Sequence, residues 1–516
     1  MSASSRRISG ADPQALVERG LLTGCAAAAA LTLHLVWQSR SWPLFHDAPL
    51  MHYIAWLIER GGVPYRDAFD MNLPGVYAIH WAVLRVLGAG DVAWRVFDLG
   101  WLAGTGFLLW AYCRPVGGVT AGAGAAILFA LYHVAGGAWR TGQRDFLMCA
   151  PILVGAWGLA RSWERGGARA PLVWSGLAIG AAMTMKPSAA LLLAAGMLVG
   201  AAARRGAPGG PLAGATAVLA GGLVAPALVV GWLAWRGGLG PFVAIFRDYV
   251  LPLYSRAGRH SLRDLVTVAQ FAHGVTIFCL FGGLAALGVA AAWRTPGAPR
   301  VGIALGGAAY GVVHYLGQGK GWEYHFYPLA VFLCAVAGSA LAGPAASRGA
   351  RASARDLLRP LAAVALAGAV VVVLHTKAVE VMQSPVVTTM VRRVTSLSRE
   401  LVTIVPAGER VQVMDTTGGG IHALFRLGIR EPTRFIYDFH FFHHTDDPRI
   451  LALRREFAAG LEAAPPAAIV IFRNDWLRNR YDRIDELPAV ASLLERRYTL
   501  AVEGDGYRIH AKRSGS

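Results

Sequence analysis

Residues 73–88, LPGVYAIHWAVLRVLG, decide how the rest of this chain is arranged. A membrane helix needs about 20 apolar residues, and this apolar stretch is shorter. It also contains Pro74, His80 and Arg85. If it crosses a membrane, every later loop changes sides. If it does not cross, it lies as an interfacial or re-entrant helix.

The composition predicts a polytopic membrane protein. Of 516 residues, 55% are hydrophobic and 16% are charged, and the mean hydropathy is +0.44. These values exclude a disordered chain and an ordinary soluble protein. The net charge of +18 would suggest nucleic acid in a soluble chain, but here the arginines separate apolar runs and act as cytoplasmic topology signals. The five cysteines fall inside or at the ends of those runs, which predicts neither disulfides nor a zinc site.

Eleven apolar runs are candidates for membrane spans. With the N-terminus inside the cell, they place the arginine-rich connections in the cytoplasm only if residues 73–88 do not cross. We therefore expect the non-crossing arrangement, with the first run as a retained anchor instead of a cleaved signal peptide. The runs are residues 20–37, 92–112, 118–136, 146–161, 171–185, 187–203, 212–234, 264–293, 300–316, 325–343 and 358–375.

Residues 377–516 are polar and contain no further run of membrane length. Apolar stretches bounded by turn residues predict strands at Val411–Met414, Arg434–Tyr437, Ala468–Phe472, Tyr498–Val502 and Tyr507–His510, with helices near 447–463 and 485–497. The predicted fold class is a polytopic α-helical membrane protein with a small C-terminal α/β extracytoplasmic domain. The predicted domains are a transmembrane module, 1–376, and a periplasmic domain, 377–516. The predicted external loops are 38–91, 137–145, 236–263 and 317–324.

The first external loop contains the richest set of acidic side chains. It reads WPLFHDAPLMHYIAWLIERGGVPYRDAFDMNLPG over residues 42–75. Asp47 begins a stretch with helical spacing that could lie along the membrane surface. It is therefore either a helix cap or a carboxylate available for catalysis. Asp67 and Asp70 could bind a substrate, but acids in a segment such as PYRDAFD often stabilise a turn instead.

The second external loop reads GGAWRTGQRDFLM over residues 136–148. Arg144 and Asp145 lie at the membrane boundary, where an unpaired charge would be expensive. They form either a local ion pair or, with Asp47 opposite, a site that could orient a substrate or bind a metal. Lys186, in MTMKPS, either contacts a phosphate or extends its amine to the membrane surface.

Two later loops combine aromatic and basic residues. The segment 236–263 suits a lipid-linked anion, although the same composition also suits an interfacial anchor. Its basic side chains are Arg247, Arg256, Arg259 and His260. The segment QGKGWEYHFYP, 318–328, adds Lys320, Glu323 and His325 as candidate substrate contacts.

Two motifs of the polar C-terminal region predict no site. HFFHHTDD, 440–447, contains potential metal ligands, but its spacing matches no strong metal motif and its end resembles a helix start. Gly418–Gly420 follows a predicted strand but lacks the GxGxxG pattern of a nucleotide loop.

The order of these features resembles that of the GT-C superfamily of membrane glycosyltransferases. The closest resemblance is to the glycosyltransferase family 39-like group of protein O-mannosyltransferases and lipid A aminoarabinose transferases. It rests on the early aspartate in FHDAPLM, the helix at PGVYAIHWAVLRVLG, the Arg-Asp of TGQRDFLM and the turn at MTMKPS. It covers roughly residues 20–345 and is sharpest over 42–90 and 136–190.

The resemblance implies an enzyme of the bacterial inner membrane that transfers a sugar, with inversion, from a polyprenyl-phosphate donor to an acceptor hydroxyl. It implies Asp47 as the base, Asp145 as the second-loop acid and Lys186 as the residue of the Lys-Pro turn. Relatives often carry an acidic pair where this chain has His46-Asp47-Ala48, and many carry Pro-Pro where it has residues 72–75. The missing second acid leaves the need for a divalent metal open.

Displacement of a sugar from a phosphate needs a carboxylate base near the acceptor hydroxyl and cations near the departing phosphate. The phosphate is a weak base with a second pKa of about 6, so no strong general acid is needed. We therefore expect Asp47 as the base and Asp145 as an orienting group. The expected phosphate contacts are Lys186, Arg144, Arg247, Arg256, Arg259 and His260, and the expected substrate contacts are Asp67, Asp70, Lys320, Glu323 and His325.

Two other classes stay open. A transporter or flippase for lipid-linked glycans would place charges or broken helices near the membrane midplane, whereas most charges here lie at its boundaries. A non-catalytic assembly component would tolerate substitution of Asp47 but not changes in 377–516. The expected partners are the lipid-linked donor, membrane lipids and a glycan, lipid or protein acceptor, without nucleic acid.

Overall fold

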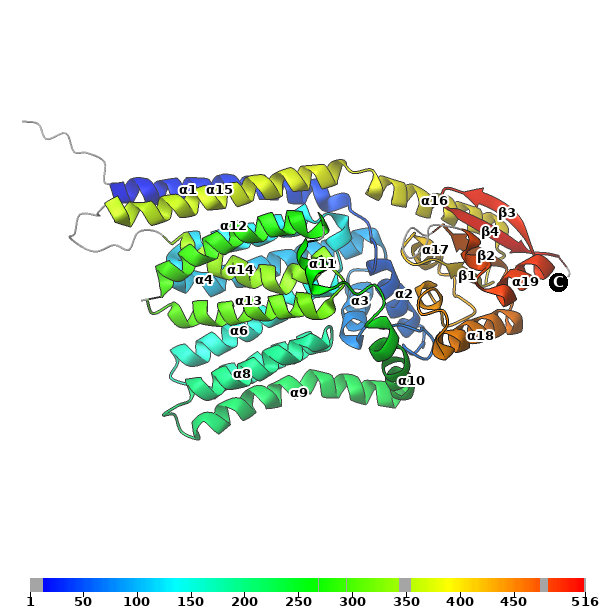
Figure 1. Cartoon of the computed structure of the whole chain (residues 1–516), viewed down its shortest axis with the longest axis horizontal. Helices are drawn as coiled ribbons and strands as arrows, with labels where there is room; N and C mark the ends of the chain where they lie inside the picture. Colours follow the sequence, from blue (N-terminus) through cyan, green and yellow to red (C-terminus); the bar gives the residue numbers. More distant parts are fainter. Residues whose placement is uncertain (1–12, 268, 294, 343–353, 474–480, 515–516) are drawn as a thin grey trace, which may run out of the picture.

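The computed structural model describes residues 13–267, 269–293, 295–342, 354–473 and 481–514. These residues form an elongated molecule with a helical bundle at one end and a small α/β part at the other (Figure 1). The predicted fold class, a polytopic α-helical membrane protein with a C-terminal α/β region, is confirmed.

The bundle contains the helices that correspond to the predicted apolar runs. Among the described residues, five helices are long and apolar enough to cross a membrane, and others are apolar but shorter. The number of crossings and the side on which each loop lies stay predictions. The bundle helices are α1 (Pro13–Gln38), α4 (Asp91–Ala135), α6 (Cys149–Glu164), α7 (Arg169–Met183), α8 (Ala190–Ala203), α9 (Gly210–Arg236), α12 (Ala269–Ala292), α13 (Ala298–Gln318), α14 (Tyr327–Ala340) and α15 (Ala354–Gln383).

Helix α4 contains two of the predicted runs as a helical hairpin. Its helical geometry fails at Gly117 and Gly118, and Gly118 has a φ of 77°, which glycine adopts without strain. The two halves then pack against each other so closely that a Cβ at Gly122 would lie 2.8 Å from the backbone oxygen of Trp110. Small residues are what allow apolar helices to approach this closely.

Two short helices lie at the end of the bundle that faces the α/β part (Figure 1). Helix α2 (Ala48–Glu59) follows Asp47, and α3 (Pro74–Val86) contains the stretch that decides the predicted topology. Helix α2 is buried from Ala48 to Trp56, whereas α3 buries Val76, Tyr77, His80 and Val83 along one face. Their position places the first predicted external loop between the two halves of the molecule.

The α/β part consists of a four-stranded sheet and its helices. The sheet order is β1-β2-β4-β3, with β1 (Val411–Met414) parallel to β2 (Ala468–Phe472) and the other pairs antiparallel. The remaining strands are β3 (Tyr498–Gly504) and β4 (Tyr507–Lys512), and the helices are α16 (Val386–Ile404), α17 (Gly420–Leu427), α18 (Pro448–Ala463) and α19 (Pro488–Arg497). The helices expected near 447–463 and 485–497 are confirmed as α18 and α19.

The strand predicted at Arg434–Tyr437 is wrong, because this segment is a buried loop. Phe435 and Tyr437 are buried as the apolar pattern suggested. Their backbone, however, has no neighbouring strand to pair with. The carbonyl of Phe435 accepts from the side chain of Gln412, 2.9 Å away, and the amide of Asp438 donates to the carbonyl of Asp415, also 2.9 Å away.

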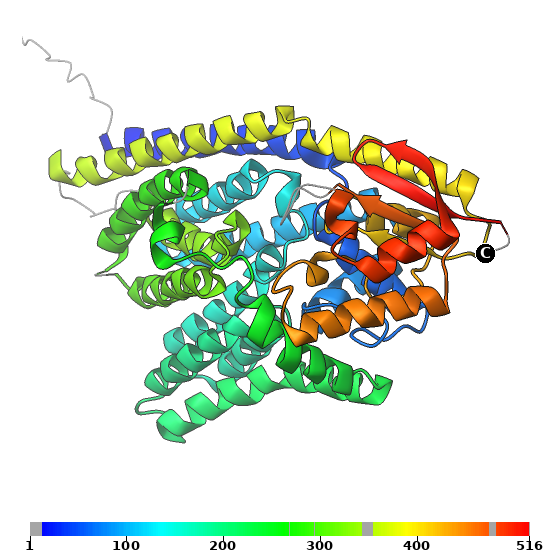
Figure 2. The same ribbon diagram turned by 45° about the vertical axis from the view of Figure 1, so that its right-hand side comes forward.

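Direct contacts fix the α/β part on the first loop. The hydroxyl of Tyr53 in α2 donates to the carbonyl of Ile429 and accepts from the amide of Glu431, both at 3.1 Å. The carboxylate of Asp91 pairs with Arg426 of α17 at 2.5 Å. Figure 2 shows the α/β part in front of the blue segment that holds α2. The α/β part therefore covers the first loop, and it forms one wall of any site that this loop contains.

Candidate functional site

A cavity with a volume of about 170 Å³ lies between the first loop, the second loop and the α/β part. Ligand pockets usually measure about 300–1,000 Å³, so this cavity suits the reacting end of a ligand whose remainder lies outside. Its lining residues are His46, Asp47, Leu50, Met51, Met71, Asn72, Trp139, Arg144, Tyr254, Trp322, Thr416, Thr417, Tyr437 and Phe439.

Asp47 is the carboxylate that lines this cavity. It precedes α2, yet its side chain makes no capping hydrogen bond. One carboxylate oxygen instead lies 2.9 Å from Nδ1 of His46, and the other accepts from Nη2 of Arg144 at 3.1 Å. His46 has a φ of 55°, unusual outside glycine, and its ring packs on Trp139 with 3.6 Å between ring centroids.

The charge of Asp47 is stabilised despite its burial. Burial raises the pKa of the carboxyl, but His46, Arg144 and Lys186 together lower it by more than burial raises it. The pKa therefore lies below its usual range. Asp47 is therefore ionised at neutral pH. Its side chain is 19% exposed, which leaves it accessible from the cavity.

Asp145 lies behind the cavity wall and is fully buried. One of its oxygens is 3.1 Å from the amine of Lys186, and the other is 2.6 Å from Nε2 of His314. His314 is held in turn by Ser188 at 2.8 Å. Asp47 and Asp145 thus each have their own cation, and Asp145 is not a cavity-lining residue. In the described part of the chain, no group of three or more His, Cys, Asp or Glu residues is placed to hold a metal ion.

Asp70 acts on the cavity through its neighbours. It is 1% exposed and accepts hydrogen bonds from Asn72, Tyr77 and Tyr437. Asn72 in turn accepts from the guanidinium of Arg144. The buried carboxylate therefore fixes Asn72, and Asn72 holds one terminal nitrogen of Arg144 while Asp47 holds the other.

Several of the other predicted contacts are engaged elsewhere. Asp67 pairs with Arg66 at 2.7 Å and accepts from the amide of Val63. Arg247 is 72% exposed and pairs with Asp248. Glu323 pairs with Arg140 at 2.9 Å and with Lys377 at 3.1 Å. None of the three predicted residues lines the Asp47 cavity.

The remaining predicted residues do not line the cavity either. Arg256, Arg259 and His260 are exposed. Lys320 is buried and donates to the carbonyls of Tyr254 and Ala257, which holds the cavity-lining Tyr254 in place. His325 is buried, with its ring centroid 6.0 Å from that of His314.

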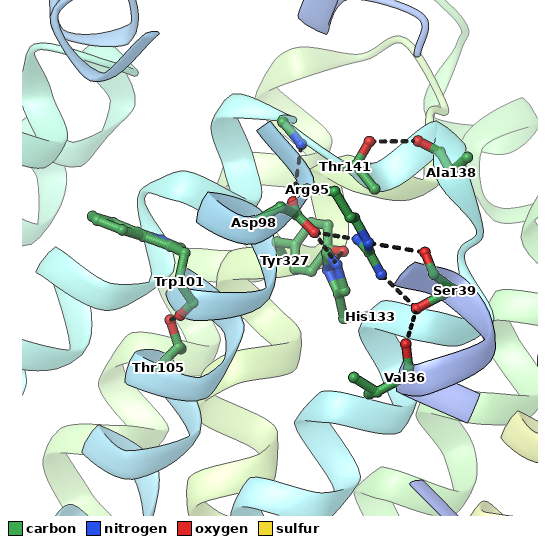
Figure 3. A network of polar contacts seen from close by, with 11 residues as sticks. Val36, Ser39, Arg95, Asp98, Trp101, Thr105, His133, Ala138, Thr141 and Tyr327 are labelled. Carbon is green, nitrogen blue, oxygen red and sulfur yellow. Dashed lines mark hydrogen bonds and ion pairs between the residues drawn. The ribbon is translucent and has the colours of Figure 1, made fainter. Parts of the chain in front are cut away.

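A second group of buried charges supports the second loop (Figure 3). Asp98 of α4 accepts from Arg95 at 2.5 Å, lies 3.2 Å from Nε2 of His133, and accepts from the amide of Gly142 at 3.3 Å. Arg95 also donates to Ser39 at the end of α1. The loop that carries Arg144 is therefore tied to two bundle helices.

Sequence reasoning missed this group and much of the cavity wall. Arg95 and Asp98 lie in an apolar run, so they were assigned to a membrane span and to no other role. Two opposite charges three residues apart in such a run would nevertheless have indicated a buried ion pair. Thr416, Thr417 and Tyr437 come from the α/β part, and no pattern in the sequence indicates that they meet the first loop.

Comparison with known proteins gives a match to a family model over part of the chain and matches to solved structures over most of it. Residues 72–235 match the family model described as dolichyl-phosphate-mannose-protein mannosyltransferase. No curated protein sequence matches the chain. The structure of ArnT from Cupriavidus metallidurans bound to undecaprenyl phosphate has a TM-score of 0.56 at 12% identity, with 95% of this chain and 98% of that chain covered.

Two further structures are similar. The apo structure of the same Cupriavidus protein has a TM-score of 0.57 at 13% identity, with 94% of this chain and 97% of that chain covered. An oligosaccharyltransferase from Archaeoglobus fulgidus, tethered with an acceptor peptide, has a TM-score of 0.49 at 13% identity, with 96% and 74% covered. The match to the Cupriavidus structures includes both the bundle and the α/β part, so the whole chain shares one known architecture.

Proposed function

From the GT-C fold of membrane glycosyltransferases, which this chain has, we propose that the protein transfers a sugar from a polyprenyl-phosphate donor to an acceptor hydroxyl. The reaction takes place at the outer face of the cytoplasmic membrane and inverts the anomeric centre. The observation that carries the proposal is Asp47, an ionised carboxylate on a cavity wall, beside the guanidinium of Arg144. The Cupriavidus protein of the same fold holds undecaprenyl phosphate in its structure, which is the class of lipid that this reaction would release.

Asp47 acts as the general base in this proposal. It accepts the proton of the acceptor hydroxyl while the hydroxyl oxygen forms a bond to the anomeric carbon. The bond from that carbon to the phosphate oxygen breaks, and the polyprenyl phosphate leaves with the electron pair. Arg144 contacts the departing phosphate, where negative charge grows in the transition state.

Binding of the donor would also make Asp47 a better base. In the empty site, the positive groups around Asp47 hold its pKa below the usual range, which weakens it as a proton acceptor. A donor phosphate that binds Arg144 offsets part of that positive charge. The pKa of Asp47 then rises toward the range in which a carboxylate accepts a proton usefully.

Asp145, Lys186 and His314 form a buried support behind the reacting groups. Lys186 keeps a positive charge near Asp47, while Asp145 fixes the position of the Lys186 amine. We propose that Asp145 is a positioning residue. Arg247, Arg256 and Arg259 lie outside the cavity and would contact a phosphate only if the loop 236–263 moves.

The test is release of polyprenyl phosphate from a panel of radiolabelled polyprenyl-phosphate sugars by the purified protein in detergent. Water can serve as a slow acceptor, so release is measurable before the acceptor is known. We expect release from at least one donor, with the freed sugar of inverted configuration by NMR. A protein that binds these donors but releases no lipid phosphate would overturn the proposal and favour transport.

A further inference from the structure

A second cavity lies further along α2 and is rich in arginine. It has a volume of about 470 Å³ and is formed by α2, the loop 60–67 and residues of the α/β part. It shares no lining residue with the Asp47 cavity. Its charged lining residues are Arg60, Arg66, Arg410, Arg430, Arg434, Asp67 and Glu431.

The arginines of this cavity are only partly neutralised by the protein. Arg66 pairs with Asp67 at 2.7 Å, and Arg434 pairs with Glu456 at 2.6 Å. The side chains of the other three have no carboxylate partner in the described part of the chain. These three are Arg60, Arg410 and Arg430.

Glu431 does not supply the missing negative charge. It is 8% exposed, and one of its oxygens accepts from the amide of Val413 at 3.0 Å. The same oxygen also accepts from the side chain of Gln412 at 2.9 Å, and burial raises the pKa of this carboxyl above its usual range. Even if Glu431 carries a full negative charge, the five lining arginines face only three carboxylates among the described residues, those of Asp67, Glu431 and Glu456. The cavity therefore keeps a surplus of positive charge.

Two of these arginines meet at one tryptophan. The guanidinium of Arg60 lies 4.3 Å from the ring centroid of Trp56, and that of Arg430 lies 6.0 Å from it. Arg430 also donates to the carbonyl of Arg60 at 3.3 Å. The two positive charges therefore lie near the same ring, and an anion bound in the cavity would offset both of them. The guanidinium group matches phosphate geometry with two parallel hydrogen bonds.

The cavity also lies next to the end of a membrane-length helix. Arg236, the last residue of α9, donates to the carbonyl of the cavity-lining Gly61 at 3.0 Å. The neighbouring Trp235 is 78% exposed, as expected of a ring at headgroup depth. A phosphate at the membrane surface beside the end of α9 would lie close to the cavity.

We propose that this arginine cavity binds a phosphate-bearing ligand at the membrane surface, at a site separate from the Asp47 cavity. The phosphate belongs either to a lipid headgroup or to a soluble phosphorylated molecule, since both present the same anion to the arginines. This binding does not depend on the proposed glycosyl transfer, so either proposal can fail while the other holds.

The test measures binding by the full-length protein in neutral detergent, with microscale thermophoresis. The probes are inorganic phosphate and short-chain phosphatidic acid, with short-chain phosphatidylcholine as a zwitterionic control. The variants are R60Q/R430Q and R410Q. The matched control is R392Q/R399Q, which removes two arginines from the exposed side of α16 in the same part of the molecule. Thermal unfolding confirms that each variant is folded.

We expect wild type and R392Q/R399Q to bind phosphatidic acid equally, and R60Q/R430Q to bind at least about tenfold more weakly, because two charge-assisted hydrogen bonds are lost. R410Q should show a smaller loss. Binding of inorganic phosphate as well would show that the anion alone is sufficient, whereas binding of phosphatidic acid alone would identify a lipid headgroup. The proposal would be overturned if R60Q/R430Q and R392Q/R399Q lost the same amount of binding affinity. It would also be overturned if wild type bound neither inorganic phosphate nor phosphatidic acid.

Discussion

The protein holds two groups of Asp, Arg and His side chains that have the same composition and different surroundings. Asp47, Arg144 and His46 lie on a cavity wall, and Asp47 is 19% exposed. The second group, around Asp98, is drawn in Figure 3 and is buried. Arg95, Asp98 and His133 are each at most 2% exposed.

The difference between the two groups lies in the capacity left for a ligand. Asp98 already accepts from two side chains and one backbone amide, and Arg95 is shared with Ser39. In the first group, Asp47 and Arg144 both line the cavity and are partly exposed, so a ligand can contact either charge. A polar group whose hydrogen bonds are all made within the protein supports the structure, whereas a group with hydrogen-bonding capacity left can act on a substrate.

The largest effect should come from D47N. The amide keeps the size of the side chain but cannot accept the proton, so we expect polyprenyl phosphate release to fall by about 100- to 10,000-fold. The melting temperature in detergent should change little. D67N serves as the control, because Asp67 is exposed and lies outside the Asp47 cavity. Release by D47N at the wild-type rate would remove Asp47 from the mechanism.

The next effect should come from D98A, and it should concern stability. Removal of this carboxylate leaves Arg95 buried without its counter-ion, which costs about 3–5 kcal/mol. Thermal or denaturant unfolding in detergent checks the loss. R95M/D98L should recover most of the stability, since a buried ion pair can be replaced by apolar side chains at little cost. A stable but inactive D98A would instead show that the buried group acts on activity by positioning the second loop.

A smaller effect should follow from N72A. Asn72 accepts from Arg144, so its loss leaves the guanidinium less well fixed beside Asp47. We expect a decrease in kcat/KM of roughly tenfold, as for loss of one hydrogen bond to a charged group. N72Q, which keeps the amide, should recover part of the activity. Unchanged kinetics in N72A would show that Asp47 alone positions Arg144.

The smallest effect concerns the pH dependence of stability through Lys320. Burial, with a contribution from Arg259, lowers the pKa of Lys320 from 10.5 to about 8. Between these two values the unfolded chain binds more protons at this residue than the folded chain. Lys320 therefore contributes more to the free energy of unfolding, and the folded state becomes more stable, as pH rises through this window. Melting temperatures from pH 7 to 10 should show wild type gaining relative to K320M, whereas a constant difference would contradict the shift.

Part of the candidate site could be predicted because polar residues at the ends of apolar runs are conspicuous. Arg144, Asp145 and Lys186 belong to this class, whereas Asp47 was indicated by its place at the start of a helical stretch in the first loop, and the structure brings the four into one cluster. Arg95 and Asp98 escaped notice because their run is apolar on average. The strand expected at 434–437 failed because a short buried apolar run occurs in a loop as well as in a strand when the backbone finds side-chain partners.

The sequence by itself determined the membrane class, the order of the helices and the presence of a polar C-terminal part, because these depend on local hydropathy and its period. Only the tertiary structure decided that residues 416, 417 and 437 line the same cavity as Asp47, and that five arginines from separate segments share another. Such contacts depend on how distant surfaces fit together in three dimensions, and a single chain read along its length carries no record of that fit.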